Sequence, residues 1–370
     1  MTRAQEVETK LAWVREALAE AGSSLCRLRG SDWFAWATAG GSSTVLMTAE
    51  TGAAEVIVGT RDAFVLTDHI EAGRLRAEQL GGELVQVLPV RAVPWGNPDA
   101  WEAAALAAVQ PGGPVLSDRP GPAEEALPEA LLVRRRTLLP AELARFRQVG
   151  RAAAEAVTGV LLAATPQMTE LELAALAGAA LRRRGLDDAL VLVAGQRRLP
   201  LYRHPTPQEE VLGNVAMLVV CARGHGLVAS LTRFVSFGPL PDAARAAHAR
   251  VRAVEAAVLA ASVPGMRLLD LYDVLAGAYR DVGDPGAMLE HHQGGLAGYQ
   301  AREAIATPGT ATSLNVGSVL AWNPSVRGAK IEDTIALTGV GLEVLTLDPA
   351  WPQATVAGLP RPLVMERTRP

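Results

Sequence analysis

The chain has 370 residues, of which 49% are hydrophobic and 20% are charged, and its formal net charge is −4. This composition is typical of a soluble globular protein with room for two domains, and no uncharged apolar run is long enough for a membrane span. Scattered arginines without a basic stripe argue against nucleic-acid binding, and a cysteine pair, Cys26 and Cys221, gives no disulfide framework, so we expect a cytoplasmic protein.

The N-terminal third of the chain predicts an α/β domain. Its opening segment has the pattern of an amphipathic helix, whose charges exclude a secretion signal. The aromatic residues Trp33, Phe34 and Trp36 favour a packed strand edge over a platform for ligand stacking. Short apolar runs predict strands, and runs with helical spacing predict helices. The strands are expected at residues 43–50, 53–60, 62–68 and 83–90, and the helices at 1–22, 70–82 and 99–109.

A Pro- and Gly-rich segment, residues 111–128, predicts the boundary between a first domain at 1–128 and a second at 129–370. The second domain alternates a helix pair, strands, another helix pair and more strands, which indicates two similar α/β halves. Thr169 and Glu172 make a capping box at one helix start, and Gly185 ends that helix. Helices are expected at 140–164, 165–185, 241–262 and 267–283, and strands at 215–224, 226–238, 316–324, 328–339 and 341–347.

Four ordered blocks in the second domain resemble the motifs of one enzyme family. In the first block, Gly213, Gly226, Thr232 and Arg233 fit the family pattern in register, and the last block, "GAKIEDTIALTGVGLEVLT", is the closest match. The family is that of creatinase, prolidase and aminopeptidase P. The resemblance implies an α/β (α+β) fold, with a creatinase/prolidase-type N-terminal domain before a pita-bread domain, and a homodimer. The blocks lie at residues 213–238, 288–304, 316–326 and 328–346.

The resemblance also assigns the positions of metal ligands. Members of the family hold two divalent ions, such as Mn, Co or Zn, with two Asp, one His and two Glu side chains. In this register the positions carry Val219, Ser230, His292, Asn323 and Glu332. Hard divalent ions need several negative oxygen ligands, and a single carboxylate remains here. We therefore expect the dinuclear site to be largely lost, with no metal ligands and no cofactor.

The candidate catalytic residues follow from the same register. His204 falls where relatives have a histidine that touches substrate, and Tyr299 falls at the position of a second such histidine. With His292 and Glu332 they form the candidate catalytic set, in which Glu332 is expected to be the anion and Tyr299 and His292 the two groups that form hydrogen bonds in the pocket. A partly buried Glu332 is expected to have a raised pKa, which suits general acid or base chemistry.

Other residues are candidates for binding substrate. These are Arg302, His291 and Asn323, and for His291 packing against a strand is an alternative. Without metal ions opposite, a buried Glu332 needs a cationic partner, and the candidates are Arg302 and Arg233. Gly294 and Gly295 are expected to allow close approach of two backbone segments.

Three functions stay open at this point. The first is an inactive or non-metallopeptidase homologue of Xaa-Pro dipeptidase that binds a small molecule or a proline-containing peptide. The second is a metal-independent amidinohydrolase that resembles creatinase, and the third is an active Xaa-Pro peptidase with unusual ligands. In each case the expected partner is a small molecule or a short peptide, and neither nucleic acid nor a membrane.

Overall fold

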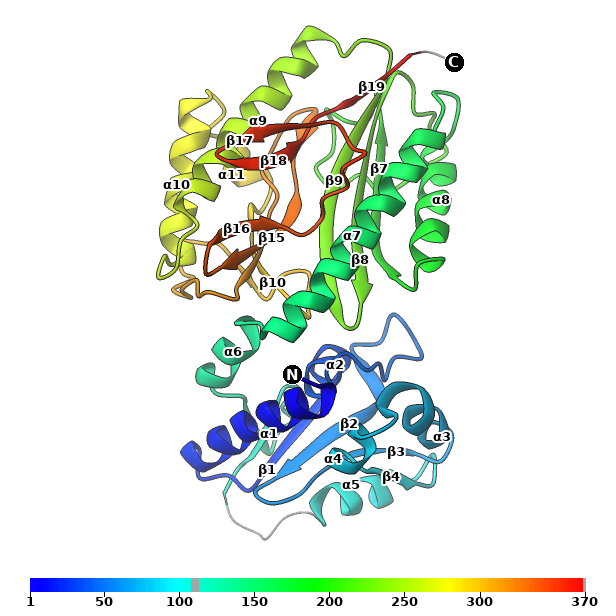
Figure 1. Cartoon of the computed structure of the whole chain (residues 1–370), viewed down its shortest axis with the longest axis vertical. Helices are drawn as coiled ribbons and strands as arrows, with labels where there is room; N and C mark the ends of the chain where they lie inside the picture. The colour runs from blue at the N-terminus through cyan, green and yellow to red at the C-terminus, as the bar shows by residue number, and fades with distance from the viewer. Residues whose placement is uncertain (108–112, 369–370) are drawn as a thin grey trace. The chain divides into compact units, whose positions relative to one another are not determined.

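The computed structural model describes residues 1–107 and 113–368. It divides into two compact units, Met1–Arg135 and Arg136–Pro370, which run from blue to red along the chain in Figure 1. The predicted boundary at residue 128 lies before helix α6 (Glu129–Arg136), and the units divide at the end of that helix. The first unit keeps α6 because Leu131 is buried and Arg135 pairs with Asp32 at 2.8 Å. Residues 111 and 112 of the predicted boundary segment lie outside the described residues.

The N-terminal unit is an α/β domain built on one mixed sheet, as the sequence predicts. Its sheet has the strand order β4-β3-β2-β1-β5-β6. The strands are β1 (Leu25–Gly30), β2 (Thr51–Gly59), β3 (Ala63–Asp68), β4 (Val90–Val93), β5 (Val115–Ser117) and β6 (Glu124–Ala126). The helices are α1 (Arg3–Glu20), α2 (Ser31–Ala37), α3 (Ala72–Arg74), the π-helical η1 (Leu75–Leu80), α4 (Leu84–Val87) and α5 (Pro98–Leu106).

Three local predictions in this unit are wrong. Residues 83–90 start with helix α4 instead of a strand, because Leu84 and Leu88 are four residues apart and both buried. Residues 43–50 form no strand, and Leu46 is 66% exposed because this run has no sheet partner. Trp33 and Trp36 lie in helix α2 instead of at a strand edge. They are buried, which confirms packing over a stacking platform.

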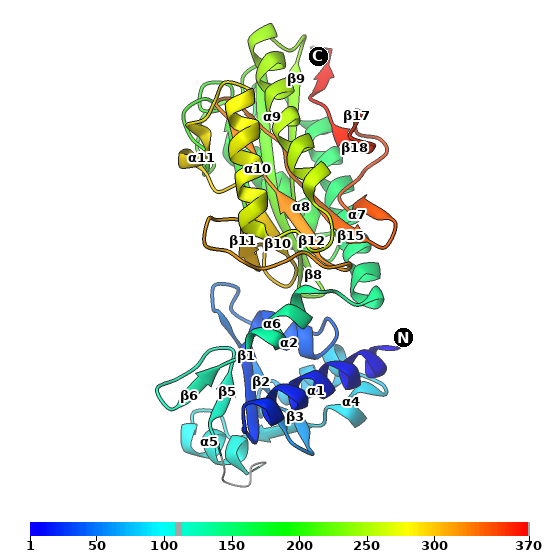
Figure 2. The ribbon, with the colours of Figure 1, turned by 90° about the vertical axis from the view of Figure 1, so that its left-hand side faces the viewer.

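The C-terminal unit has the predicted two halves, each with a helix pair and a sheet (Figures 1 and 2). The expected capping box joins Thr169 and Glu172, and α8 ends before Gly185, which has a φ of +72°. The first half contains α7 (Pro140–Ala163), α8 (Glu170–Arg182), and the sheet β19-β9-β8-β7, with β7 (Asp187–Gly195), β8 (Val215–Gly224), β9 (Leu227–Phe237) and β19 (Met365–Arg367).

The second half repeats this plan with shorter strands. Helices α9 (Asp242–Ala261) and α10 (Leu268–Asp281) lie side by side in Figure 2, and the short α11 (Ala287–Glu290) follows. Its sheet has the order β11-β10-β12-β15-β16. The strands are β10 (Gly294–Ala297), β11 (Ala304–Ile305), β12 (Val319–Trp322), β15 (Asp333–Thr338) and β16 (Gly341–Val344), with the small pairs β13 (Ser325–Val326) with β14 (Ala329–Lys330) and β17 (Gln353–Val356) with β18 (Leu359–Pro362).

The two halves meet where β9 passes the segment between β14 and β15. A single β-bridge joins Thr232 to Glu332, with the Thr232 N–H donating to the Glu332 carbonyl at 3.0 Å. Next to it, Arg233 pairs with Asp333 at 2.8 Å in the buried interior. Charged side chains from both sheets therefore come together at this junction between the halves. They are buried there in pairs, because an unpaired buried charge is costly.

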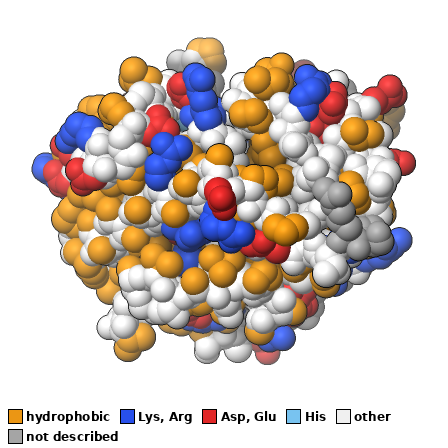
Figure 3. Space-filling view, turned by 90° about the horizontal axis from the view of Figure 1, so that it is seen from above, with side chains coloured by type: hydrophobic (Ala, Val, Ile, Leu, Met, Phe, Trp, Pro, Cys, Tyr) orange, Lys and Arg blue, Asp and Glu red, His pale blue; other side chains and the backbone are white. Residues whose placement is uncertain are grey.

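The surface mixes side chains of different kinds on the one face that Figure 3 draws. On the face in Figure 3, basic and acidic side chains are interspersed, with hydrophobic side chains spread among them. Among the described residues, no helix combines the length and hydropathy that crossing a membrane requires.

Candidate functional site

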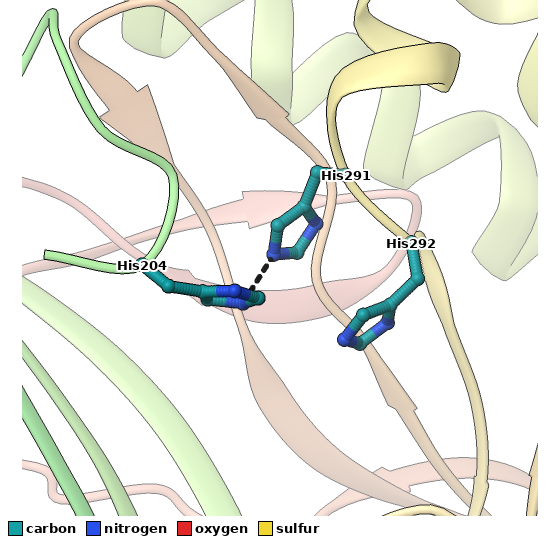
Figure 4. A group of neighbouring side chains, drawn as sticks. All are labelled: His204, His291 and His292. Carbon is teal, nitrogen blue, oxygen red and sulfur yellow. Dashed lines mark hydrogen bonds between the residues drawn. The ribbon is translucent and has the colours of Figure 1, made fainter.

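Three histidines from two distant segments meet in the C-terminal unit (Figure 4). His204 lies in the loop after β7, and His291 and His292 lie between α11 and β10. The Nε2 atoms of His204 and His291 are 3.0 Å apart, and one ring nitrogen of each histidine lies within 4.8 Å of the others. Because one ring must donate and the other accept at the 3.0 Å contact, His204 and His291 differ in tautomer.

Buried hydrogen bonds fix the backbone of this cluster. The Gln293 amide donates from Nε2 to the His291 carbonyl at 2.5 Å and accepts from the Tyr279 hydroxyl at 2.6 Å. Tyr279 is fully buried on α10. On the other side, Arg203 pairs with Glu290 at 2.5 Å and so ties the His204 loop to the end of α11. The segments that carry the three rings are therefore held in place by neighbouring residues and not by the rings alone.

The glycine pair after the histidines lets β10 fit between its neighbours. Gly294 and Gly295 have φ values of +98° and +154°. A Cβ atom on Gly294 would lie 2.1 Å from the Ala321 carbonyl oxygen, and one on Gly295 would lie 2.2 Å from that of Ala304. The predicted close approach of backbone is confirmed, and it places the histidines at the start of a central strand.

A cavity of about 490 Å³ adjoins the histidines. His291 is buried, His292 is partly exposed and His204 is exposed, so the cluster forms one wall of a space that solvent reaches. Its polar lining also includes Glu290, Gln293, Tyr272 and Thr307. The volume is in the range of small-molecule sites.

All three imidazoles are neutral near pH 7. Burial, followed by the positive charge of Lys330, lowers the pKa of His291 to about 2. Burial, followed by the charge of Arg302, lowers the pKa of His292 to about 4. The pKa of His204 is also below its ordinary value, for the same reasons. Each ring therefore presents one N–H donor and one lone pair.

Glu332 lies in a separate ion cluster beside the histidines, which we call the Glu332 cluster: Glu332, Arg302, Lys330 and Thr232. The buried carboxylate accepts from Arg302 Nη2 at 2.7 Å and from Thr232 Oγ1 at 2.9 Å, and Lys330 Nζ lies 3.2 Å away. Burial alone would raise the pKa of Glu332, but the charges of Lys330 and Arg302 reverse this effect and lower the pKa to about 2.

The expected raised pKa of Glu332 is therefore wrong, because the sequence interpretation left out Lys330. Of the two arginines considered as partners, Arg302 makes the ion pair, and Arg233 instead pairs with Asp333. Lys330 was not among the candidate partners, although the rarity of lysine in the chain sets it apart. Lysine occurs at two positions in the chain, and the other, Lys10, is also buried and pairs with Glu6 at 2.7 Å.

Tyr299 and Asn323 have surroundings that the sequence did not indicate. The buried Tyr299 hydroxyl, expected to form hydrogen bonds in the pocket, donates to Glu142 Oε1 on α7 at 2.6 Å. Asn323 is 2% exposed, and its N–H donates to the Gln293 carbonyl. Among the described residues its Oδ1 has no hydrogen-bond partner. Asn323 thus lies beside the histidine segment, and Tyr299 is anchored to α7.

The two strand positions that the resemblance assigns to aspartate ligands lie on β8 and β9. Val219 packs with Leu192 and Phe234 in a hydrophobic cluster. Ser230 Oγ lies 3.3 Å from Cys221 Sγ and accepts from Arg302 Nη1 at 3.4 Å. The Arg302 guanidinium therefore contacts both Ser230 and Glu332, two of the five positions assigned to metal ligands.

Comparison with known proteins identifies the family. The model of metallopeptidase family M24 matches residues 144–339. An agropine synthesis cyclase from Rhizobium rhizogenes is 31% identical over 156 residues, a match that spans 39% of this chain and 39% of that protein. The chain thus covers well under half of the length of this curated relative.

Solved structures show the same fold at low identity. A Xaa-Pro dipeptidase from Bacillus anthracis has a TM-score of 0.74 at 16% identity, covering 98% of this chain and 100% of its own. The prolidase from Pyrococcus horikoshii OT3 has a TM-score of 0.77 at 15% identity, covering 92% and 98%. The N-terminal domain of the FACT complex subunit SPT16 from Cicer arietinum has a TM-score of 0.67 at 13% identity, covering 93% and 95%.

These structural likenesses establish the fold, an N-terminal domain followed by a pita-bread domain, and leave the activity open. The family match covers more than half of the 370 residues. It agrees with the resemblance to creatinase, prolidase and aminopeptidase P that the sequence blocks carry. The chain therefore belongs to metallopeptidase family M24.

Proposed function

We propose that this chain is a member of family M24 that lacks the dinuclear metal site of the family and binds a small molecule or a short peptide in its histidine-lined cavity. The observation that carries the proposal is the Glu332 cluster. Arg302 and Lys330 supply positive charge to the remaining carboxylate, at 2.7 Å and 3.2 Å. Divalent ions would supply that charge in a metallopeptidase.

The ligand positions do not fit a pair of hard divalent ions. Val219 offers no donor atom, and Ser230 and Asn323 offer neutral oxygens where the family has carboxylates. Both oxygens of Glu332 are already engaged by protein groups. Since such ions need several negative oxygen ligands, two of them would have to displace the buried Arg302 and Lys330 contacts.

The Glu332 cluster also favours binding over peptide hydrolysis. With a pKa of about 2, Glu332 stays ionised near neutral pH and has no proton to give. A carboxylate whose oxygens are already hydrogen-bonded is a poor base toward water. The three neutral histidines remain as donors and acceptors toward a ligand.

The charges near the cavity favour a ligand with an anionic end. Arg302 and Lys330 carry two positive charges against the one negative charge of Glu332, so this cluster has one positive charge in excess. The free carboxylate of a proline-containing dipeptide fits this chemistry. The relative named as an agropine synthesis cyclase supports chemistry other than peptide hydrolysis on related sequences. A cytoplasmic homodimer belongs to the same proposal, and light scattering after size-exclusion chromatography tests the dimer.

The test combines binding and hydrolysis with the full-length chain. Gly-Pro, Ala-Pro, guanidino compounds and simple carboxylates are screened by thermal shift and calorimetry, with His291→Ala and the exposed His69→Ala as a matched pair. We expect a ligand that stabilises the wild type and His69→Ala, and that His291→Ala binds at least tenfold more weakly. Cleavage of Ala-Pro with Mn(II) or Co(II), abolished by chelator and by Glu332→Gln, would contradict the proposal.

A further inference from the structure

We infer that His204, His291 and His292 form a site for a single divalent transition-metal ion of the kind that prefers nitrogen ligands, such as Zn(II), Ni(II), Co(II) or Cu(II). One ring nitrogen of each histidine lies within 4.8 Å of the others. Tetrahedral zinc bound to imidazole at 2.0–2.1 Å places its ligand nitrogens about 3.4 Å apart. Small rotations of the rings close this difference, since the His204 and His291 nitrogens are already 3.0 Å apart.

The rings have polar atoms that the protein leaves unsatisfied. Two nearly parallel rings, His291 and His292, lie with centroids 4.7 Å apart. Among the described residues, Nδ1 of each has no hydrogen-bond partner, although both atoms are buried. A buried polar atom without a partner is costly, so an ion or ligand that engages these nitrogens is favoured.

The supporting contacts favour a preformed site. The Arg203–Glu290 ion pair holds the loop that carries His204 against the end of α11. The Tyr279–Gln293 pair holds the backbone of His291 from the buried side. Ligands on two segments therefore keep their separation without the ion, which reduces the ordering cost of binding.

The donor set selects the class of metal. The three donors are imidazole nitrogens, with no carboxylate among them, and the positive charges of Arg302 and Lys330 act on them. Manganese and magnesium need negative oxygen ligands, whereas zinc, nickel, cobalt and copper bind imidazole well. Three protein ligands leave a fourth position for water or an anionic ligand atom from the adjoining cavity of about 490 Å³.

This site is distinct from the dinuclear site of the family. It shares His292 with the positions that the resemblance assigns to metal ligands, and it uses none of the four others. The inference therefore does not rest on the proposed function. The inferred site holds one ion, whereas the family site holds two. Glu332 belongs to the family's ligand positions and not to the inferred site. Its substitution therefore distinguishes the three-histidine site from the dinuclear site.

The test is a metal titration of the untagged full-length chain after removal of metals by chelator. Zn(II), Co(II) and Mn(II) are titrated into the wild type, His204→Ala, His291→Gln, His69→Ala and Glu332→Gln, with circular dichroism to check folding. We expect one equivalent of Zn(II) and Co(II), with Mn(II) at least a hundredfold weaker. His204→Ala and His291→Gln should each lose at least tenfold in Zn(II) affinity, and His69→Ala and Glu332→Gln should not.

His204 is exposed in a loop, so its alanine variant keeps the test decisive if His291→Gln fails to fold. Bound Co(II) should also give the visible absorption of a four-coordinate ion, and His204→Ala should abolish it. Zinc binding that is equal in the wild type and His204→Ala would overturn the inference. Two bound ions that Glu332→Gln removes would also overturn the inference. A different result, Mn(II)-dependent cleavage of Ala-Pro, would contradict the proposed function.

Discussion

The Glu332 cluster and the histidine cluster are neighbours with opposite character. Glu332 is buried and ionised, and protein groups occupy both of its oxygens. The histidines are neutral and line a cavity, and among the described residues Nδ1 of His291 and of His292 has no hydrogen-bond partner. Two adjoining groups of side chains thus differ in kind: one is an internal ion network, while the other lies open to a cavity.

Lys330→Met should have the largest effect, because it removes a charge that the buried Glu332 needs. Breaking a buried ion pair costs about 3 kcal/mol. We expect the free energy of unfolding in urea to fall by about that amount, and Lys330→Met with Glu332→Gln should recover part of it. A loss below about 1 kcal/mol would mean that Glu332 does not depend on Lys330 as a buried ion pair does.

His292 of the histidine cluster and Glu332 should respond to acid in different pH windows. His292 has a folded pKa of about 4, below the ordinary 6.5, so the unfolded chain takes up its proton first and stability falls from pH 6.5 toward 4. Glu332 has a folded pKa of about 2, below the ordinary 4.5, so its contribution is present above pH 4.5 and is lost from there toward pH 2.

Unfolding free energies measured from pH 7 to pH 3 separate these windows. His292→Gln should reduce the loss of unfolding free energy between pH 6.5 and pH 4.5 by on the order of 1–2 kcal/mol, and Glu332→Gln should reduce the loss below pH 4.5. The buried His248 and His291 have pKa values lowered to about 4 and about 2, so both contribute above pH 4.5 and some slope remains in His292→Gln. His291 also contributes below pH 4.5, so some slope remains in Glu332→Gln. If His292→Gln and Glu332→Gln gave the same dependence of unfolding free energy on pH, His292 and Glu332 would not titrate in different windows.

Tyr279→Phe should have a moderate effect, because it deletes the hydroxyl that supports Gln293 and Ser325. Loss of a buried hydrogen bond costs about 1–2 kcal/mol of unfolding free energy. The same variant should weaken ligand binding in the cavity, since the His291 backbone loses its support. Phe64→Leu in the N-terminal core serves as a control of similar stability cost, and it should leave ligand binding unchanged.

Arg203→Ala should have the smallest effect on stability, because its partner Glu290 is 41% exposed at the side chain. The expected change is below about 1 kcal/mol. Ligand affinity should fall by severalfold, since the loop with His204 is freed. Arg197→Ala removes a comparable exposed pair with Glu210 and should leave the affinity unchanged. Equal effects of the two variants would argue against a positioned His204.

Much of the fold follows from local sequence patterns. The capping box of Thr169 and Glu172 and the two-fold alternation of helices and strands are visible in the sequence, because they depend on neighbours along the chain. Local patterns were less reliable at Leu84, where a short apolar run fits a helix as well as a strand. The strands β1 and β7 were missed, although Cys26 and Val193 are buried in them.

The site was less predictable than the fold, because its properties depend on contacts between distant segments. The register brought His204 and His292 forward as candidates, and the structure places them with His291. No sequence pattern indicates that Lys330 pairs with Glu332, or that Tyr299 donates to Glu142 across 157 residues of sequence. The direction of the Glu332 pKa follows from those pairings, so it could not be derived beforehand.

Elemental analysis of manganese is the most direct test of the central claim that Arg302 and Lys330 take the place of the dinuclear ions. The untagged chain is incubated with Mn(II), dialysed, and measured beside Glu332→Gln and His292→Ala. The account predicts no stoichiometric manganese in any of the three proteins. About two manganese ions per chain in the wild type, lost in Glu332→Gln and in His292→Ala, would contradict it.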